Sequence, residues 1–121
     1  MDNFQVLYAE DEFTNRKLLE IQLTKNGITI DTASDGLQAL YKIKVNHYDL
    51  VILDHYMPGM NGDVLAAEIR KTKPDLPLLA ITSDDSYTDM LLNAGFAEVF
   101  IKPLRGTDYI ETIRKYLPVK E

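Results

Sequence analysis

The sequence predicts an α/β fold, a doubly wound, five-stranded parallel sheet with the strand order 2-1-3-4-5. Three observations predict it. Strand-like and helix-like segments alternate five times along the 121 residues. Residues 50–53 and 78–81 are continuously apolar, which is typical of strands that helices cover on both faces. The helical patterns between the strands are long enough for right-handed crossovers, which connect parallel strands.

The first half of the chain contains three of the expected strands. The first is predicted at residues 4–9, and the alternation of apolar and polar residues at 28–33 indicates an edge strand. The helix between them should end at Gly27. A second helix begins at about Asp35 and leads to the apolar strand at 50–53.

The second half contains the other two strands. A helix from about Gly62 follows a break in the chain at Pro58 and Gly59. The strand at 78–81 comes next. A helix that ends at Gly95 then leads to the strand at 99–101. The residues that the five helices should turn toward the sheet are Leu18, Leu19 and Leu23; Leu37, Leu40 and Ile43; Leu65 and Ile69; Met90, Leu91 and Ala94; and Tyr109, Ile110, Ile113 and Leu117.

The composition indicates one globular domain and argues against several classes of function. Hydrophobic residues make up 45%, which is enough for a core at this length. The absence of cysteine excludes a disulfide framework and a thiolate metal site. A net charge of −6 argues against nucleic-acid binding, because no excess of Lys and Arg exists to contact phosphates. Without a membrane-length apolar run or a signal-like start, the sequence predicts a cytoplasmic protein with no membrane insertion.

Residues that can carry chemistry follow four of the expected strands. Glu10 and Asp11 follow the first strand, Asp54 the third, Thr82 the fourth and Lys102 the fifth. The carboxyl ends of parallel strands meet at one edge of a sheet, where ligands bind. Each residue alone has a structural explanation, such as helix capping for the acidic pair or a turn for the aspartate. Their joint placement indicates a single site.

The residue types in this group indicate phosphoryl transfer. Two carboxylates about 4 Å apart repel by ~4 kcal/mol at an effective dielectric constant near 20, so Glu10, Asp11 and Asp54 need a cation. Mg²⁺ prefers oxygen ligands and often binds a phosphate as well. Lys102 adds a positive charge and Thr82 a hydroxyl, and such groups promote phosphoryl transfer by positioning and by neutralising charge. Asp54 is the candidate nucleophile, because carboxylates can form acyl phosphates.

Five stretches of the chain also carry the motifs of a known family. They are 6–12 (VLYAEDE), 49–54 (DLVILD), 57–62 (MPGMNG), 79–82 (LAIT) and 100–103 (FIKP). As a set, they make the sequence resemble the receiver domains of two-component response regulators over essentially its whole length. The resemblance implies a flavodoxin-like fold and a single receiver domain over residues 1–121, with no output domain.

The resemblance further implies the roles of the acidic residues. Asp54 would be the phosphoacceptor, and it would also be a ligand of Mg²⁺. Asp11 would bind the ion directly, and Glu10 largely through water. The backbone carbonyl of Tyr56 would complete the protein's share of the metal ligands.

Two further residues would act on the phosphoryl group, and one position departs from the family pattern. Thr82 would donate a hydrogen bond to a phosphoryl oxygen and shift with its helix as the switch. Lys102 would pair with the phosphoryl group, and its bond to Pro103 is commonly cis in the family. The position three residues before this lysine is usually an aromatic that turns inward on activation, but here it is Val99. Valine is stiff at χ1 and has no ring, so we expect a muted or rerouted change in the fourth helix and fifth strand.

The family resemblance also names a class of partner. The donor would be a phosphohistidine on a histidine kinase or a histidine phosphotransfer domain. Residues 12–19 and 93–96 resemble the receivers of hybrid histidine kinases and phosphorelays in particular. The chain would be a monomer or a weak dimer through the fourth and fifth helices. The surface that would dock the partner comprises Phe13, Thr14, Arg16, Lys17 and Leu104.

Three residues border the predicted phosphoryl group or its acceptor. Tyr56 and Asp84 lie next to the group, and the Tyr56 ring would either screen the acyl phosphate from water or simply lie on the surface. His55 is expected to be an exposed loop residue rather than a metal ligand, because Mg²⁺ prefers oxygen.

Two other functions compete with this one. A small aspartyl-phosphate hydrolase of the haloacid dehalogenase kind needs a second aspartate two residues after the nucleophile, but that position is Tyr56. An interaction module that is not phosphorylated usually loses the acid pair, the acceptor or the lysine, and this chain retains all of them. The sequence therefore favours a phosphoacceptor that is not a turnover enzyme.

Overall fold

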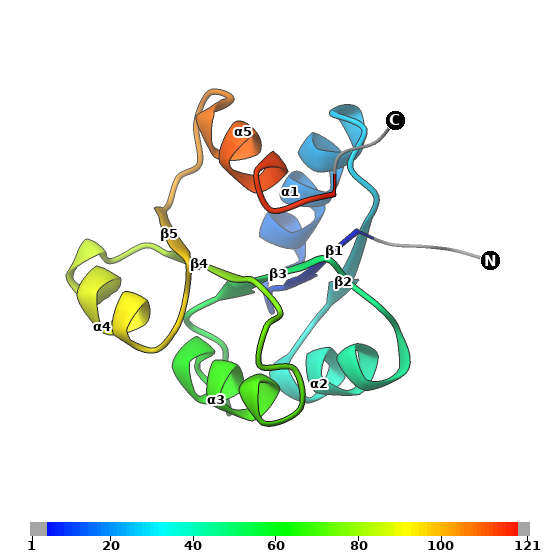
Figure 1. Ribbon diagram of the computed structural model, residues 1–121. Helices are drawn as coiled ribbons and strands as arrows, with labels where there is room; N and C mark the ends of the chain where they lie inside the picture. Colours follow the sequence, from blue (N-terminus) through cyan, green and yellow to red (C-terminus); the bar gives the residue numbers. More distant parts are fainter. Residues whose placement is uncertain (1–4, 119–121) are drawn as a thin grey trace.

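The computed structural model describes residues 5–118, in which a parallel sheet is flanked by helices (Figure 1). The sheet order is β2-β1-β3-β4-β5, so the predicted doubly wound architecture is confirmed. Within the described residues, no helix is long and apolar enough to cross a membrane. The elements are β1 (Val6–Ala9), α1 (Phe13–Lys25), β2 (Ile30–Ala33), α2 (Gly36–Val45), β3 (Leu50–Asp54), α3 (Gly62–Thr72), β4 (Leu78–Thr82), the 3₁₀ turn η1 (Asp85–Tyr87), α4 (Thr88–Asn93), β5 (Glu98–Ile101) and α5 (Asp108–Arg114).

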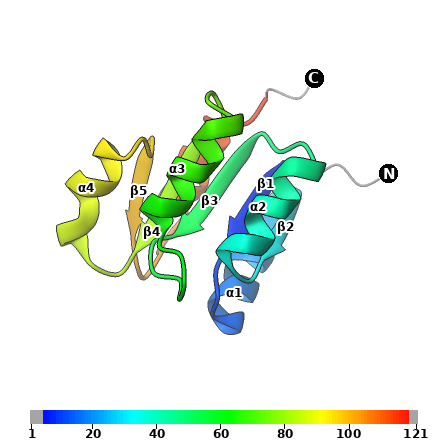
Figure 2. The ribbon, with the colours of Figure 1, turned by 90° about the horizontal axis from the view of Figure 1, so that it is seen from below.

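Helices cover both faces of the sheet. Figure 1 shows α1 and α5 on one face and α2, α3 and α4 on the other, and Figure 2 shows α2 and α3 side by side. Alternate residues of β1 enter two separate cores: Val6 and Tyr8 pack toward α1 and α5, whereas Leu7 and Ala9 pack toward α2 and α3. The central strands β3 and β4 are buried along their whole length, which explains why their sequences are so apolar.

The predicted strands agree with the structure to within two residues at each end. Phe4, predicted to begin the first strand, lies outside the described residues. Gly27 follows the end of α1, as expected, and its φ of +79° falls in the left-handed region that glycine adopts without steric cost. Gly95 has the same role after α4, with a φ of +108°.

The rotation of the helices was predicted less well. Leu19, Ile43 and Leu91 are buried as expected, but the predictions for Leu18, Leu37 and Met90 are wrong, because these three side chains are exposed. A helix turns by about 100° per residue, so Leu18 and Met90 turn away from the sheet where their neighbours Leu19 and Leu91 face it. In α2, the buried positions are Ala39 and Ile43, and Leu37 instead starts an exposed apolar stripe with Tyr41 and Val45.

The register of the sheet brings the predicted site residues to one edge. Ala9 pairs with Leu53, Asp54 with Ile81, and Thr82 with Ile101. The carboxyl ends of β1, β3, β4 and β5 are therefore level with one another. The residues that follow or end these strands share one rim of the sheet.

Candidate functional site

A lysine joins two buried carboxylates at this rim. The Lys102 Nζ donates hydrogen bonds to Asp54 Oδ2 at 3.0 Å and to Glu10 Oε1 at 3.1 Å. Glu10 is 1% exposed and Asp54 is 4% exposed, whereas the lysine is half-buried. Buried carboxylates are stable only with charge-assisted partners, and Lys102 supplies one to both. The ammonium thus lies at the position that the sequence predicted, beside the candidate phosphoacceptor.

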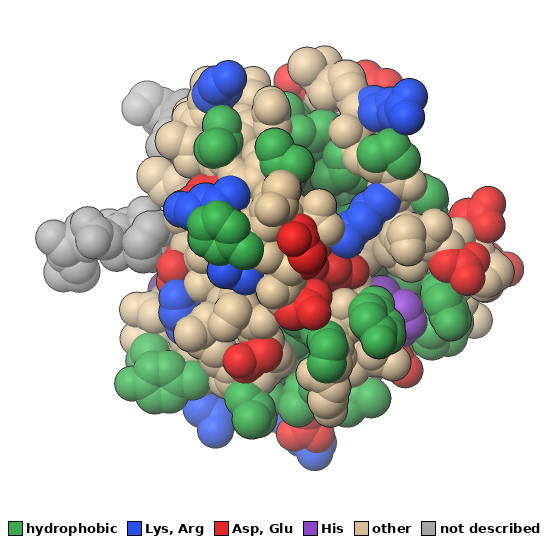
Figure 3. All heavy atoms as spheres, turned by 180° about the vertical axis from the view of Figure 1, so that it is seen from behind, with side chains coloured by type: hydrophobic (Ala, Val, Ile, Leu, Met, Phe, Trp, Pro, Cys, Tyr) green, Lys and Arg blue, Asp and Glu red, His purple; other side chains and the backbone are tan. Residues whose placement is uncertain are grey.

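Asp11 adds a third carboxylate, which is exposed at the mouth of the site. One carboxylate oxygen from each of Glu10, Asp11 and Asp54 lies within 4.8 Å of the other two. Figure 3 shows acidic side chains gathered near the middle of one face of the molecule, with a basic side chain beside them. A set of carboxylate oxygens that is open to water suits Mg²⁺, which keeps several of its own waters. The acidic cluster of this protein can therefore bind Mg²⁺.

The pKa values of these groups reflect an excess of negative charge. Burial, followed by the neighbouring Asp54 carboxylate, raises the pKa of Glu10. Burial and the Glu10 carboxylate likewise raise the pKa of Asp11. Burial alone would lower the pKa of Lys102, but its hydrogen bonds and attraction to Asp54 and Glu10 outweigh that effect and raise it. The lysine therefore stays protonated, and one ammonium does not balance three carboxylates.

Glu10 is held by more groups than the sequence indicated. The Tyr8 hydroxyl donates to Glu10 Oε1 at 3.1 Å, and the Glu12 backbone N–H donates to Oε2 at 3.2 Å. The Arg16 guanidinium donates to the backbone carbonyl of Glu10 at 2.9 Å. Sequence reasoning placed Arg16 only on the docking surface and did not consider Tyr8. The available signal was a polar-tipped residue two positions before Glu10, on the same face of an otherwise apolar strand.

Thr82 lies at the rim but engages its own chain. Its side chain is buried, and its hydroxyl accepts a hydrogen bond from the Asp84 backbone N–H at 3.2 Å. Within residues 5–118, no hydrogen bond joins Thr82 to Asp54. The Asp84 carboxylate in turn accepts a hydrogen bond from the Ser86 N–H in η1. Hydrogen bonding from the Ser86 side chain, and then from its backbone, lowers the pKa of Asp84. The hydroxyl is therefore near the acceptor but has a local partner.

The two residues after Asp54 have opposite environments. Tyr56 is 71% exposed, and its backbone N–H donates to Asp54 Oδ1 at 3.3 Å. The expectation that His55 is exposed is wrong, because only 6% of it is accessible and its ring packs at a tilt against the Tyr87 ring, with the ring centroids 4.7 Å apart. The loop after β3 folds back so that the Gly62 N–H donates to the His55 carbonyl at 2.8 Å. A Cβ at Gly62 would lie 3.1 Å from the His55 Cα, so glycine permits this close approach.

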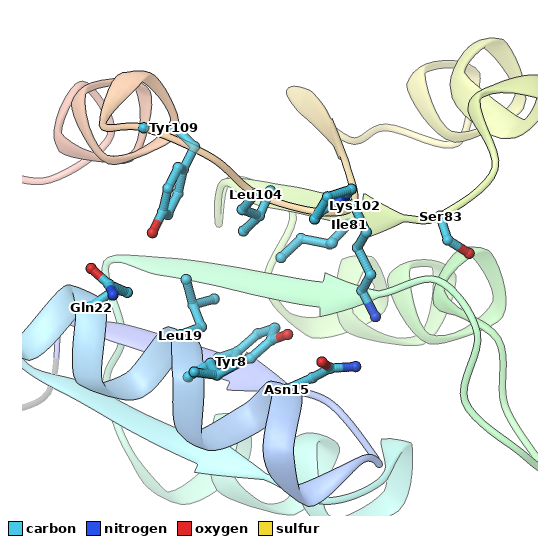
Figure 4. Close-up of a pocket in the computed structure, with 12 residues that line it drawn as sticks. Tyr8, Asn15, Leu19, Gln22, Ile81, Ser83, Lys102, Leu104 and Tyr109 are labelled. Carbon is cyan, nitrogen blue, oxygen red and sulfur yellow. The ribbon is translucent and has the colours of Figure 1, made fainter.

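The residues that were predicted to dock a partner lie on and beside α1. Phe13, Thr14 and Lys17 are exposed, and the Arg16 guanidinium lies over the Phe13 ring at 5.4 Å. Leu104 lines a cavity of about 600 Å³ between α1 and the segment that follows β5 (Figure 4). The bond between Lys102 and Pro103, at the edge of this cavity, is cis as expected.

Comparisons with known proteins identify the family. The family model of the response regulator receiver domain matches residues 6–114. The sensor protein EvgS of Escherichia coli K12 is 37% identical over 105 residues, which are 85% of this chain and 9% of EvgS. The response regulator MprA of Mycobacterium sp. strain KMS is 32% identical over 115 residues, which are 93% of this chain and 50% of MprA. The chain thus spans half the length of one relative and about a tenth of the other.

A solved structure gives the same result for the fold. The response regulator TrrA of Thermotoga maritima, in complex with Mg²⁺–BeF, superposes with a TM-score of 0.86 and 37% sequence identity. The match covers 94% of this chain and 99% of that chain. The family model covers most of this chain, and the chain belongs to the response regulator receiver domains of two-component systems.

Proposed function

We propose that Asp54 accepts a phosphoryl group from a phosphohistidine and that Glu10, Asp11, Thr82 and Lys102 assist this transfer. The observation that carries the proposal is the pair of hydrogen bonds from Lys102 to Asp54 and Glu10, at the rim where the third carboxylate opens to water. Phosphoryl transfer depends mainly on positioning and on neutralising charge, and this arrangement provides both.

The metal ligands in this proposal are the carboxylates of Glu10, Asp11 and Asp54 together with the backbone carbonyl of Tyr56. The Tyr56 N–H already contacts Asp54, so this stretch of backbone lies beside the acceptor. TrrA, which is 37% identical, was solved with Mg²⁺–BeF. A bound Mg²⁺ would supply the positive charge that offsets the carboxylates and the oxygens of the incoming phosphoryl group.

The protein's own residues have separate tasks in the transfer. An oxygen of the Asp54 carboxylate forms the new bond to phosphorus as the bond from phosphorus to the histidine nitrogen breaks. The electron pair of that bond stays on the imidazole nitrogen, which takes up a proton. The Lys102 ammonium contacts the Asp54 carboxylate before the transfer and the phosphoryl oxygens after it. The Thr82 hydroxyl gives up the hydrogen bond that it donates to the Asp84 backbone carbonyl and donates to a phosphoryl oxygen instead, which would move the start of η1 and α4.

We assign the docking of the partner to Phe13, Thr14, Arg16, Lys17 and Leu104. Phe13 is 60% exposed, and such an exposed ring beside two cations can bind an apolar and acidic helix surface. The partner would be a histidine kinase or a histidine phosphotransfer domain, met in the cytoplasm by a monomer or weak dimer. EvgS is a sensor protein with a matching segment, which supports a partner of this kind.

The chain is proposed to be a phosphoacceptor without turnover on external substrates. Tyr56 stands where an aspartyl-phosphate hydrolase of the haloacid dehalogenase kind needs its acid, and its phenol cannot act as that carboxylic acid. The receiver would act alone or as one part of a longer protein, with the single domain spanning residues 1–121.

Incubation with acetyl phosphate and Mg²⁺, followed by intact mass, tests this function. One phosphoryl group should be added to the wild-type protein and none to the Asp54→Asn variant. An Asp75→Asn variant is the matched control, because Asp75 is an exposed carboxylate outside the acidic cluster. No modification of the wild-type protein would favour an interaction module, and release of many equivalents of phosphate would favour a hydrolase.

A further inference from the structure

A buried tyrosine lies behind the acidic cluster. Tyr8 is 2% exposed, and its ring packs in the core between the sheet and helices α1 and α5. Its hydroxyl leaves that core and donates to Glu10 Oε1 at 3.1 Å. Figure 4 shows the ring beside Leu19, with the hydroxyl directed toward the ammonium end of Lys102. Tyr8 thus connects the apolar interior of the domain with a carboxylate of the phosphoryl-transfer site.

Glu10 Oε1 accepts hydrogen bonds from two groups, the Lys102 ammonium and the Tyr8 hydroxyl. Lys102 contacts both Glu10 Oε1 and Asp54, so it must divide its charge between them. The Tyr8 hydroxyl makes its only hydrogen bond within the described residues to Glu10. A tyrosine hydroxyl carries its proton at neutral pH, so Tyr8 is the donor in this hydrogen bond.

This arrangement matters when Lys102 turns to the phosphoryl group. Glu10 is 1% exposed, and a buried carboxylate that loses its donors is strongly disfavoured. When Lys102 turns away, Glu10 Oε2 still accepts a hydrogen bond from the Glu12 N–H. Oε1 then depends on the Tyr8 hydroxyl, which is its remaining donor among the described residues. We propose that Tyr8 is a positioning residue that keeps Glu10 oriented for Mg²⁺. The proposal rests on the function assigned to Asp54 above.

The chain offers a matched control for the loss of this hydroxyl. Tyr116 also donates to a glutamate, Glu98 Oε2, at 2.7 Å. Glu98 begins β5, at the opposite end of the strand from Lys102, so this pair lies away from the acidic cluster. Tyr8→Phe and Tyr116→Phe therefore remove the same atom and the same kind of hydrogen bond, in one case at the site and in the other away from it.

Calorimetric titration with Mg²⁺ alone tests the proposal. Removing a group that orients a metal ligand typically weakens metal binding by 10–100-fold. Because Glu10 keeps the Glu12 N–H, we expect about tenfold weaker Mg²⁺ binding for Tyr8→Phe, at the low end of that range. Tyr116→Phe should bind Mg²⁺ as the wild type does. In a Glu10→Gln background, Tyr8→Phe should have little further effect, because the two residues act together.

Phosphorylation by acetyl phosphate at increasing Mg²⁺ gives a second measurement. For Tyr8→Phe, the Mg²⁺ concentration at half-maximal rate should rise about tenfold, while the rate at saturating Mg²⁺ stays near that of the wild type. A merely structural role would change neither quantity selectively. The proposal is overturned if Tyr8→Phe and Tyr116→Phe reach their half-maximal rates at the same Mg²⁺ concentration. It is also overturned if Tyr8→Phe has a lower rate at saturating Mg²⁺ while its half-maximal Mg²⁺ concentration is that of the wild type.

Failure of this inference can be told apart from failure of the proposed function. If wild-type protein neither binds Mg²⁺ nor becomes phosphorylated, the function itself is wrong. If wild-type protein does both and Tyr8→Phe behaves identically, only the role of Tyr8 is wrong. Should Tyr8→Phe fail to fold, tyrosine ring NMR of the wild type decides: Mg²⁺ should shift the Tyr8 resonances and leave those of Tyr116 unchanged, and an unshifted Tyr8 overturns the proposal.

Discussion

Replacing Asp11 by asparagine should make the Mg²⁺-free protein more stable. An Asp11 carboxylate oxygen lies within 4.8 Å of one oxygen each of Glu10 and Asp54. Two unit charges at that distance repel by about 3.5 kcal/mol at an effective dielectric constant of 20 and by about 0.9 kcal/mol at that of water. Asp11 is exposed, so the lower figure applies, and the Lys102 ammonium offsets roughly one of the two repulsions. We therefore expect the free energy of unfolding to rise by about 1 kcal/mol.

Mg²⁺ should reverse this order. Binding to the folded state stabilises the wild-type protein by about 2.7 kcal/mol at 100 times the dissociation constant. The Asp11→Asn variant lacks one ligand and gains much less at the same concentration. The wild type should thus be the less stable protein in EDTA and the more stable one in Mg²⁺.

Urea unfolding under both conditions measures the effect. The control is Asp75→Asn, which removes an exposed carboxylate outside the acidic cluster. Added NaCl should reduce the difference in EDTA, because salt screens exposed charges. An Asp11→Asn variant that is no more stable than the wild type in EDTA, or a gain equal to that of Asp75→Asn, would refute the electrostatic reasoning.

Three more outcomes are expected. In EDTA, the difference in unfolding free energy between wild type and Asp11→Asn should narrow as the pH is lowered from 8, which urea unfolding at each pH would show. The folded-state pKa values of Glu10 and Asp11 are raised, so the repulsion between the carboxylates is complete at pH values above them and is relieved as the pH falls through them. Tyr56→Ala should shorten the lifetime of the phosphorylated protein several-fold in a time course of intact mass, if the exposed ring screens the acyl phosphate. Tyr41→Ala, on the exposed face of α2, should leave that lifetime unchanged, and an equal lifetime for both variants would assign Tyr56 to the surface alone. Val99 packs its branched side chain against the core below α4, so NMR spectra of the protein with and without Mg²⁺–BeF should change little in α4 and β5, and a large rearrangement there would contradict this.

The sheet and the rim could be predicted from the sequence because their signals are local. The continuous apolar run in β3 exists because both faces of that strand are buried, and a buried strand gives little room for another interpretation. Asp54 ends this strand and Lys102 follows β5, so the topology alone brings the two together. The bond of 3.0 Å between them agrees with that reasoning.

The parts that sequence did not predict depend on tertiary contacts. The burial of His55 follows from the loop that Gly62 allows to fold back, and nothing in the neighbours of His55 signals it. The exposure of Leu37 depends on the rotation of α2, which the apolar residues spread around that helix leave ambiguous. The Tyr8 hydrogen bond was visible only as a spacing of two along a strand, and the same spacing is common among core residues.

The charges at the rim explain why phosphorylation should require a divalent ion. The three carboxylates and the single ammonium leave an excess of two negative charges, which one Mg²⁺ would neutralise. Transfer to Asp54 replaces its single negative charge with about two, because an acyl phosphate retains two ionisable oxygens. With the ion present, the site is left with about one surplus negative charge, which donors such as the Thr82 hydroxyl can meet at short range. Without the ion the surplus would be about three, and Lys102 would have to leave Glu10 without a cationic partner to reach the new group. The signal is thus a small excess of charge at the end of β3, beside the end of β4 and the start of η1.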